Sequence, residues 1–143
     1  MRLLCRGRQA VQIAGVPGET ATWRVDVPYR VVNSTRETVL AEHSDKAANP
    51  VRRGVGLIGR KGLPSGGGLI IQPCNSVVSF FMRFPIDVAF VNRDTRVVHM
   101  IHAMPPWRTS KIVRGAKLVV ELPAGTLNDT HTELGDTLVI QET

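Results

Sequence analysis

The sequence predicts an all-β fold, an antiparallel barrel or sandwich of about eight short strands with one short helix. Runs of β-branched and aromatic residues recur at spacings of roughly 8–12 residues, and turn-forming residues separate them. No long amphipathic helical pattern lies between these runs, which disfavours an alternating βαβ architecture. The 143 residues fit one domain, and a hydrophobic fraction of 43% is ordinary for a globular protein.

The expected strands differ in how much of their surface they bury. Residues 23–27 alternate large apolar with charged side chains, which is typical of a half-buried strand. Residues 69–71 and 77–82 are apolar enough to be buried on both faces. The other strands are expected at residues 29–32, 38–41, 87–91, 97–101, 117–122 and 137–140, with polar turns at 33–36 and 92–96.

The helix and the glycine-rich loop are expected before the middle of the chain. A short helix is predicted from about Asn49 to Ile58, with Asn49 as its N-cap and Pro50 at its first position. Residues 54–68 hold seven of the thirteen glycines, so we expect a loop or turn there rather than a packed element. Residues 1–28 are expected to form a partly flexible extension ahead of a single domain at 29–143.

Charge is unevenly distributed along the chain, whose formal net charge is +6. Residues 46–86 contain six bases and no acid, whereas residues 118–143 contain five acids and no base. Mutual neutralisation of these segments is the favoured interpretation, and an anion-attracting basic surface is the alternative. Bases and aromatic residues interleave only around residues 80–84 and 107–108, and Phe80, Phe81 and Phe84 are expected in the core. Nucleic acid is therefore the least favoured partner.

The cysteines and apolar runs indicate a cytoplasmic protein. Cys5 and Cys74 lie far apart without metal-ligand spacing, which is typical of a reducing compartment, and Cys74 is expected as a small buried hydrophobe. No run approaches the ~18 apolar residues of a membrane helix, and we expect no membrane association. The first residues contain no apolar stretch long enough for a signal peptide.

Two apparent motifs fail on their context. Residues 54–59 spell the dinucleotide fingerprint, but no buried strand precedes them and no acid follows before Asp87 to bind a ribose. His99 and His102 are three apart in an expected strand, so their side chains face opposite sides and do not form a metal site. The sequence therefore predicts no metal site and no cofactor.

Four ordered motifs carry a resemblance to a known family. They are residues 56–60 with 68–76, residues 80–90, residues 116–125, and the pair Gly135-Asp136. Together they resemble the bacterial and archaeal domain-of-unknown-function family numbered 192, over roughly residues 29–140. The resemblance implies a small all-β domain of barrel or sandwich type and implies no activity. Many relatives carry His and Thr where this chain has Val78 and Ser79, so a catalytic role for that His does not carry over.

The candidate site is built on acids that lie in apolar strands. Asp87 and Glu121 must be hydrogen-bonded, paired, or shifted in pKa, and Arg60 and Arg83 are natural partners for them. Pro85 fixes the backbone that positions the residues around it. The ligand-binding candidates are therefore Arg60, Met82, Arg83, Asp87 and Glu121. The other interpretation is an ion-pair or capping network that holds the barrel together, and Asp136 is expected to be a turn acid.

The sequence does not identify a function. The leading hypothesis is a small binding or structural β domain with a polar cleft for a small molecule or peptide. The alternatives are a hydrolase or lyase with Asp87 or Glu121 as general base, and a weak nucleic-acid binder that uses residues 46–86. The identity of any catalytic residues and the oligomeric state stay open.

Overall fold

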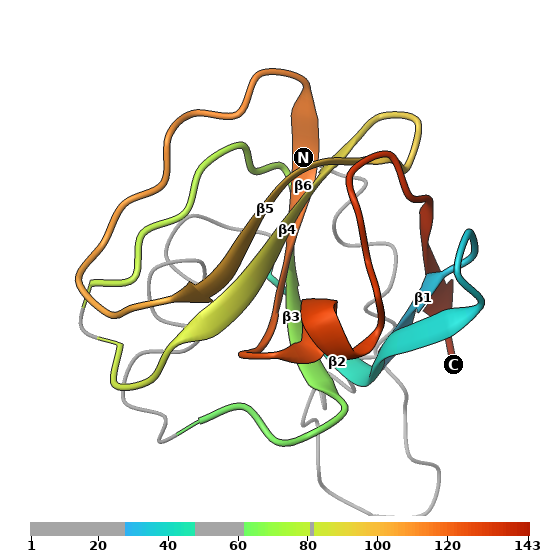
Figure 1. Cartoon of the computed structure of the whole chain (residues 1–143), viewed down its shortest axis with the longest axis horizontal. Coiled ribbons are helices and arrows are strands. Elements are labelled where there is room, and N and C mark those ends of the chain that lie inside the picture. The colour runs from blue at the N-terminus through green and yellow to red at the C-terminus, as the bar shows by residue number, and fades with distance from the viewer. Residues whose placement is uncertain (1–27, 48–61, 81) are drawn as a thin grey trace, which may run out of the picture.

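The computed structural model describes residues 28–47, 62–80 and 82–143, and their strands form one curled sheet (Figure 1). The strand order in the sheet is β5-β4-β6-β3-β2-β1-β7. The sheet curls into a half-barrel, so the all-β prediction is confirmed and the architecture is of the barrel type. The elements are β1 (Tyr29–Asn33), β2 (Thr38–Ala47), β3 (Gly67–Ile71), β4 (Ile86–Asn92), β5 (Val97–Met104), β6 (Ala116–Pro123), α2 (Thr126–Asp129) and β7 (Leu138–Glu142).

One strand pair departs from the antiparallel arrangement that the sequence predicts. β2 and β3 run parallel, with Ser44 opposite Gly68, while the other paired neighbours in the sheet are antiparallel. Parallel neighbours need a long crossover connection, and the 19 residues from 48 to 66 that join these strands are long enough to supply one. The length of this connection can be read from the sequence, but the parallel direction of β3 relative to β2 cannot.

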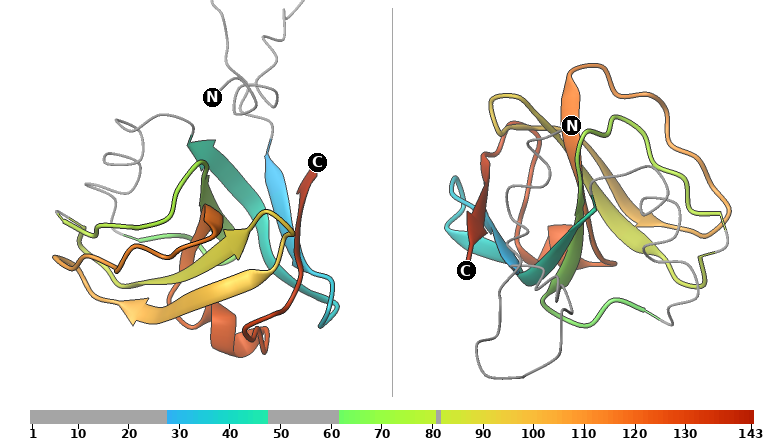
Figure 2. Two further views of the ribbon diagram at one scale, coloured as in Figure 1. Left: turned by 90° about the horizontal axis from the view of Figure 1, so that it is seen from above. Right: turned by 180° about the vertical axis from the view of Figure 1, so that it is seen from behind.

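The two edges of the sheet are joined at one end of the half-barrel. Arg96, just before β5, forms an isolated bridge with Thr137, just before β7. The Leu138 backbone N–H donates to the Thr95 carbonyl at 2.8 Å, and the Val97 N–H donates to the Asp136 carbonyl at 2.9 Å. These contacts bring the first and last strands of the order together, so the sheet curls rather than lying open (Figure 2).

The sheet buries apolar side chains on both of its faces, in two clusters. Alternate residues of β4 enter different clusters: Val88 and Phe90 the first, Ala89 and Val91 the second. The first cluster is completed by residues of two loops, 72–85 (without residue 81, which lies outside the described residues) and 105–115, which we call the loop pair. They include Cys74, which is a buried free thiol as expected. In both views the two loops run side by side beyond β4 and β6 (Figure 1; Figure 2). The second cluster lies on the other face and takes residues from all seven strands and from α2, so it lies inside the half-barrel.

The prediction of a strand at residues 77–82 is wrong. In its described residues the segment forms one isolated β-bridge, between Val78 and Thr109, and does not extend into a ladder of paired residues. Val77 and Ser79 are buried, whereas Val78 and Phe80 are exposed. The core position expected for Phe80 is therefore also wrong, because the loop pair covers the sheet with one side and presents the other to solvent. Phe84 packs against the first cluster, and Phe81 lies outside the described residues.

Two further expectations need correction, and others lie outside the described residues. Gly67 and Gly68 are buried at the start of β3 rather than in a loop, and the sequence did not predict α2. The helix expected at 49–58, the strand expected at 23–27 and the residues of the dinucleotide-like motif lie outside the described residues. The division into an extension at 1–28 and a domain at 29–143 stays a prediction. No helix of the described ranges is long and apolar enough to cross a membrane.

Gly68→Ala is expected to lower the free energy of unfolding by about 1–3 kcal/mol. A Cβ at this position would lie 2.8 Å from the Ser44 Oγ, 3.2 Å from the Ala41 Cβ and 3.2 Å from the Glu121 carbonyl. Gly62→Ala is the matched control, because a Cβ there meets no atom of the described residues within 4 Å. Urea denaturation of both variants measures the effect, and equal midpoints would show that β3 yields to the added methyl group.

Candidate functional site

The structure does not gather the five candidate residues into one site. Arg60 lies outside the described residues. Met82 is buried in the first cluster, and Arg83 is exposed next to it in the chain. Asp87 on β4 and Glu121 on β6 are both buried, on neighbouring strands. A ligand site made of all five residues stays a prediction.

The two buried acids point away from opposite faces of the sheet. The register pairs Asp87 with Leu122 and Val88 with Glu121. Directly paired residues share a face, and Leu122 belongs to the second cluster while Val88 belongs to the first. Asp87 therefore lies on the second-cluster face and Glu121 on the first-cluster face. One cleft cannot use both carboxylates.

Three backbone N–H groups bind the carboxylate of Asp87, which is 0% exposed. Its Oδ1 accepts from the Ala103 N–H at 2.8 Å, near the end of β5. Its Oδ2 accepts from the Gly125 N–H at 3.1 Å and from the Leu127 N–H at 2.9 Å, in the first turn of α2. These bonds satisfy N–H groups that the start of a helix leaves unpaired. The geometry matches the capping interpretation, because both oxygens are directed at the backbone.

Glu121 is buried, and the described part of the chain gives it no such donors. Its neighbours across the strand pairs are Leu69 and Val88, both in the first cluster. The described residues form no hydrogen bond to its carboxyl group, and burial raises its pKa to about 8. Since the group lies in an apolar environment, it is mostly protonated at neutral pH.

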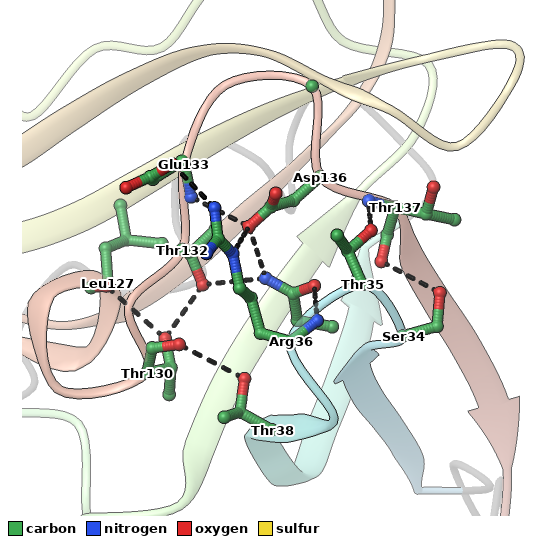
Figure 3. Close-up of polar contacts among 12 residues, drawn as sticks. Ser34, Thr35, Arg36, Thr38, Leu127, Thr130, Thr132, Glu133, Asp136 and Thr137 are labelled. Carbon is green, nitrogen blue, oxygen red and sulfur yellow. Dashed lines mark hydrogen bonds and ion pairs between the residues drawn. The ribbon is translucent and has the colours of Figure 1, made fainter.

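A third buried acid, Asp136, belongs to the densest polar network of the described residues (Figure 3). Its Oδ2 accepts from Asn33 Nδ2 at 2.9 Å, from Arg36 Nε at 3.1 Å and from the Glu133 N–H at 2.9 Å. Burial raises the pKa of this carboxyl, but these hydrogen bonds and the Arg36 charge outweigh burial and lower it. The network ties the turn after β1 to the loop before β7, so Asp136 does more than end a turn.

The described residues also line a cavity, of about 380 Å³, on the second-cluster side of the half-barrel. Val91, Leu118 and Leu138 supply apolar wall, and Lys46 and Glu142 supply charge. The Lys46 Nζ lies 5.3 Å from the centre of the Tyr29 ring, a cation–π distance. Burial lowers the pKa of Lys46, and the Glu142 charge acts in the opposite direction. The full lining is Tyr29, Lys46, Gln72, Val91, Thr95, Leu118, Leu138, Val139, Ile140 and Glu142.

The cavity was not apparent from the sequence. Its lining comes from β1, β2, β4, β6 and β7 and from Gln72 and Thr95 outside the strands, and these parts meet only when the sheet curls. The sequence signal available was Lys46, a base five residues after the strand predicted at residues 38–41. In the described ranges no group of three or more His, Cys, Asp or Glu residues is placed to hold a metal ion.

Comparison with known proteins gives matches to uncharacterised proteins. The family DUF192, described as "Uncharacterized ACR", matches residues 31–140. The UPF0127 protein PF1050 of Pyrococcus furiosus is 36% identical over an alignment of 97 residues, and the match covers 64% of this chain and 81% of that protein.

Two solved structures share the fold. A protein of unknown function from Novosphingobium aromaticivorans superimposes with a TM-score of 0.68 at 21% identity, over 78% of this chain and 83% of that one. A Sinorhizobium meliloti protein, provisionally described as a transcription regulator, gives a TM-score of 0.63 at 21% identity, over 78% of this chain and 90% of that one. At this identity the two structures show a common fold and nothing about activity.

Asp87→Asn is expected to lower the free energy of unfolding by about 3 kcal/mol. An amide has one acceptor oxygen, so its NH2 group would face a backbone N–H that the carboxylate now binds. Asp94→Asn is the control, since Asp94 is exposed in the β4–β5 turn. Thermal and urea denaturation measure both, and an Asp87→Asn variant as stable as Asp94→Asn would contradict the capping role.

Glu121 is expected to make the protein less stable as the pH rises. Its pKa is about 8 in the folded protein, above the ordinary value of 4.5, so folding favours its neutral form. This contribution is fully present below about pH 4.5 and is lost as the pH rises to about 8. Glu121→Gln should remove the decline, and urea denaturation between these pH values measures it. A wild-type decline that Glu121→Gln leaves intact would assign the titration to another group.

Proposed function

Because the chain belongs to DUF192, a family of unknown function, its role has to be argued from its own geometry, and we propose that it is a small-molecule binding domain. Its ligand is a small amphipathic anion that enters the cavity of the half-barrel. The observation that carries the proposal is the cavity of about 380 Å³ with apolar walls and a lysine in its lining. Binding sites for small molecules have volumes of roughly 300–1,000 Å³ and combine apolar walls with a few polar groups.

The apolar part of the ligand is matched by the walls. Val91 and Leu138 are buried members of the second cluster, and Leu118 packs against that cluster. These side chains come from three strands of one sheet, so the apolar walls do not depend on a loop for their position. Apolar surface that a ligand buries here gains roughly 25 cal/mol per Å² removed from water.

The anionic part of the ligand is matched by Lys46. This side chain is partly buried, and burial lowers its pKa, so a negative charge beside it favours the ammonium form. Glu142 lies in the same lining but is exposed, where water screens its charge. The less exposed charge of the lining is therefore positive, and the proposal predicts preference for a carboxylate over the matching alcohol.

The enzymatic alternative has less support. Both oxygens of Asp87 bind backbone N–H groups, and Glu121 lies on the other face of the sheet from the cavity. A general base needs to reach the proton that it removes, and neither residue lines the cavity. A cytoplasmic location is part of the proposal, and the buried free thiol of Cys74 supports it.

A thermal-shift assay with octanoate and phenylacetate, beside octanol and phenethyl alcohol, tests the proposal. A carboxylate at a hundred times its dissociation constant adds about 2.7 kcal/mol, which is on the order of 5 °C in Tm. Leu118→Trp, which fills the cavity, and Lys46→Gln, which removes the charge, should each abolish the shift. Lys117→Gln is the matched control, because Lys117 is exposed and outside the lining.

The outcomes separate the parts of the proposal. Equal shifts with the acid and the alcohol would contradict the role of Lys46 but keep the cavity as a site. Shifts that survive Leu118→Trp would place the ligand elsewhere. If neither acid raises the Tm of the wild-type protein, while the wild type and the variants all fold with the same Tm, the proposal is overturned.

A further inference from the structure

The loop pair forms a hydrogen-bonded platform beside the sheet rather than two independent loops. The Ser79 N–H donates to the Arg108 carbonyl at 2.8 Å, and the Trp107 N–H donates to the Ser79 carbonyl at 2.9 Å. The buried Ser79 hydroxyl donates to the Pro105 carbonyl at 2.7 Å and accepts from the Arg108 N–H at 2.9 Å. Farther along, the Val113 N–H donates to the Asn75 carbonyl at 2.8 Å. The loops therefore hold each other in register.

The outer side of this platform presents aromatic rings to solvent. Phe80 is 44% exposed and Trp107 is 55% exposed, and their ring centres lie 6.0 Å apart with planes tilted by 35°. Val78 and Ile112, one on each loop, are also exposed. Trp107 has a φ of 63°, a left-handed conformation that is uncommon for a bulky residue. A costly backbone conformation that displays a large ring at the surface is typical of a functional site.

The charge of the platform has one sign. Residues 72–85 and 105–115 contain four bases and no acid, and all four side chains are exposed: Arg83, Arg108, Lys111 and Arg114. The Arg108 guanidinium donates to the Trp107 carbonyl at 3.3 Å, which keeps a positive charge beside that residue. Exposed rings with exposed cations complement a chain of flat bases joined by phosphates.

We propose that this platform binds single-stranded nucleic acid, with bases stacked on Phe80 and Trp107 and phosphates beside Arg108 and its neighbouring cations. Nucleic acid was disfavoured as a partner because the Phe80 ring was expected in the core. The structure removes that objection for Phe80, and Trp107 is exposed beside it. The proposed surface overlaps the expected basic segment at residues 72–85, but it contains only Arg83 of that segment's six bases, and its other cations lie in residues 105–115.

The observations favour a single strand over a duplex and over an acidic peptide. In a duplex the bases are paired and stacked on each other, so their faces are not available to two exposed side-chain rings. An acidic peptide would satisfy the cations but has no reason to require the tilted pair of rings. The three ligands therefore differ in how much their affinity depends on Trp107.

Fluorescence anisotropy of the full chain with labelled oligothymidine and oligouridine tests the proposal. Trp107→Ala and Phe80→Ala should each weaken binding on the order of ten-fold, which is the usual effect of one stacked base. Arg108→Gln should lower the slope of log K against log salt by about 0.7. The controls are Leu134→Ala and Arg93→Gln, which remove an exposed apolar side chain and an exposed base outside the platform. Unchanged Tm values exclude unfolding as the cause.

A second readout follows the ring itself. Trp23 and Trp107 are the two tryptophans, so in a Trp23→Phe background the emission reports Trp107 alone, and a stacked base should quench it. No binding at low salt, or affinity unchanged in both Trp107→Ala and Phe80→Ala, would overturn the proposal. Equal binding of a duplex or of polyglutamate would overturn it as well, and would assign the surface to polyanions in general. None of these outcomes bears on carboxylate binding in the cavity.

Discussion

The carboxylate of Asp87 is the interaction on which the arrangement of the sheet depends. It is fully buried, and it joins β4 to the end of β5 and to the start of α2 through three backbone N–H groups. A buried carboxylate without hydrogen-bond donors costs several kcal/mol. Burial of Asp87 is therefore favourable only when β4, the end of β5 and the start of α2 lie together. α2 leads directly into the loop that carries Asp136, which is bonded to the turn after β1. The position of α2 is thereby passed on to β7 and to the end where the two edges of the sheet meet.

The strands were largely predictable, because their apolar pattern depends on local chemistry. The predictions for residues 69–71, 87–91, 97–101 and 117–122 fall within β3, β4, β5 and β6. The sequence also indicated that Asp87 and Glu121 need compensation, and the two take different routes, hydrogen bonding and protonation. It could not tell that they lie on opposite faces, because that depends on the register of β4 against β6. Asp87 and Glu121 both lie in apolar strands, but a single ligand site that uses both carboxylates therefore does not form.

The failures have a common physical cause: an apolar run indicates contact with a core but not how many of its faces are covered. Residues 77–82 were expected to be buried on both sides, yet Val78 and Phe80 are exposed. The opposite error occurred at Gly68, where glycine composition suggested a loop. Gly68 lies in β3, and a glycine is needed at this strand position because Ser44 and the Glu121 backbone leave no space for a side chain. α2 has four residues, too few for a periodic pattern, and its cap comes from Asp87, distant in sequence.

The cavity and the loop-pair platform lie on opposite sides of the same strands, and this arrangement separates the two proposed activities. The cavity contacts the second cluster, while the platform covers the first, and β4 and β6 with their buried residues stand between them. A ligand in one site therefore does not occlude the other. Coupling between the cavity and the platform would require β4 and β6 to adopt a second packed arrangement. Close-packed protein interiors change between discrete arrangements rather than deforming continuously. The bonds from Asp87 to β5 and α2 oppose such a shift, because it would separate a buried carboxylate from its donors. The rigidity that Asp87 gives the sheet thus favours two independent sites over one regulated by the other.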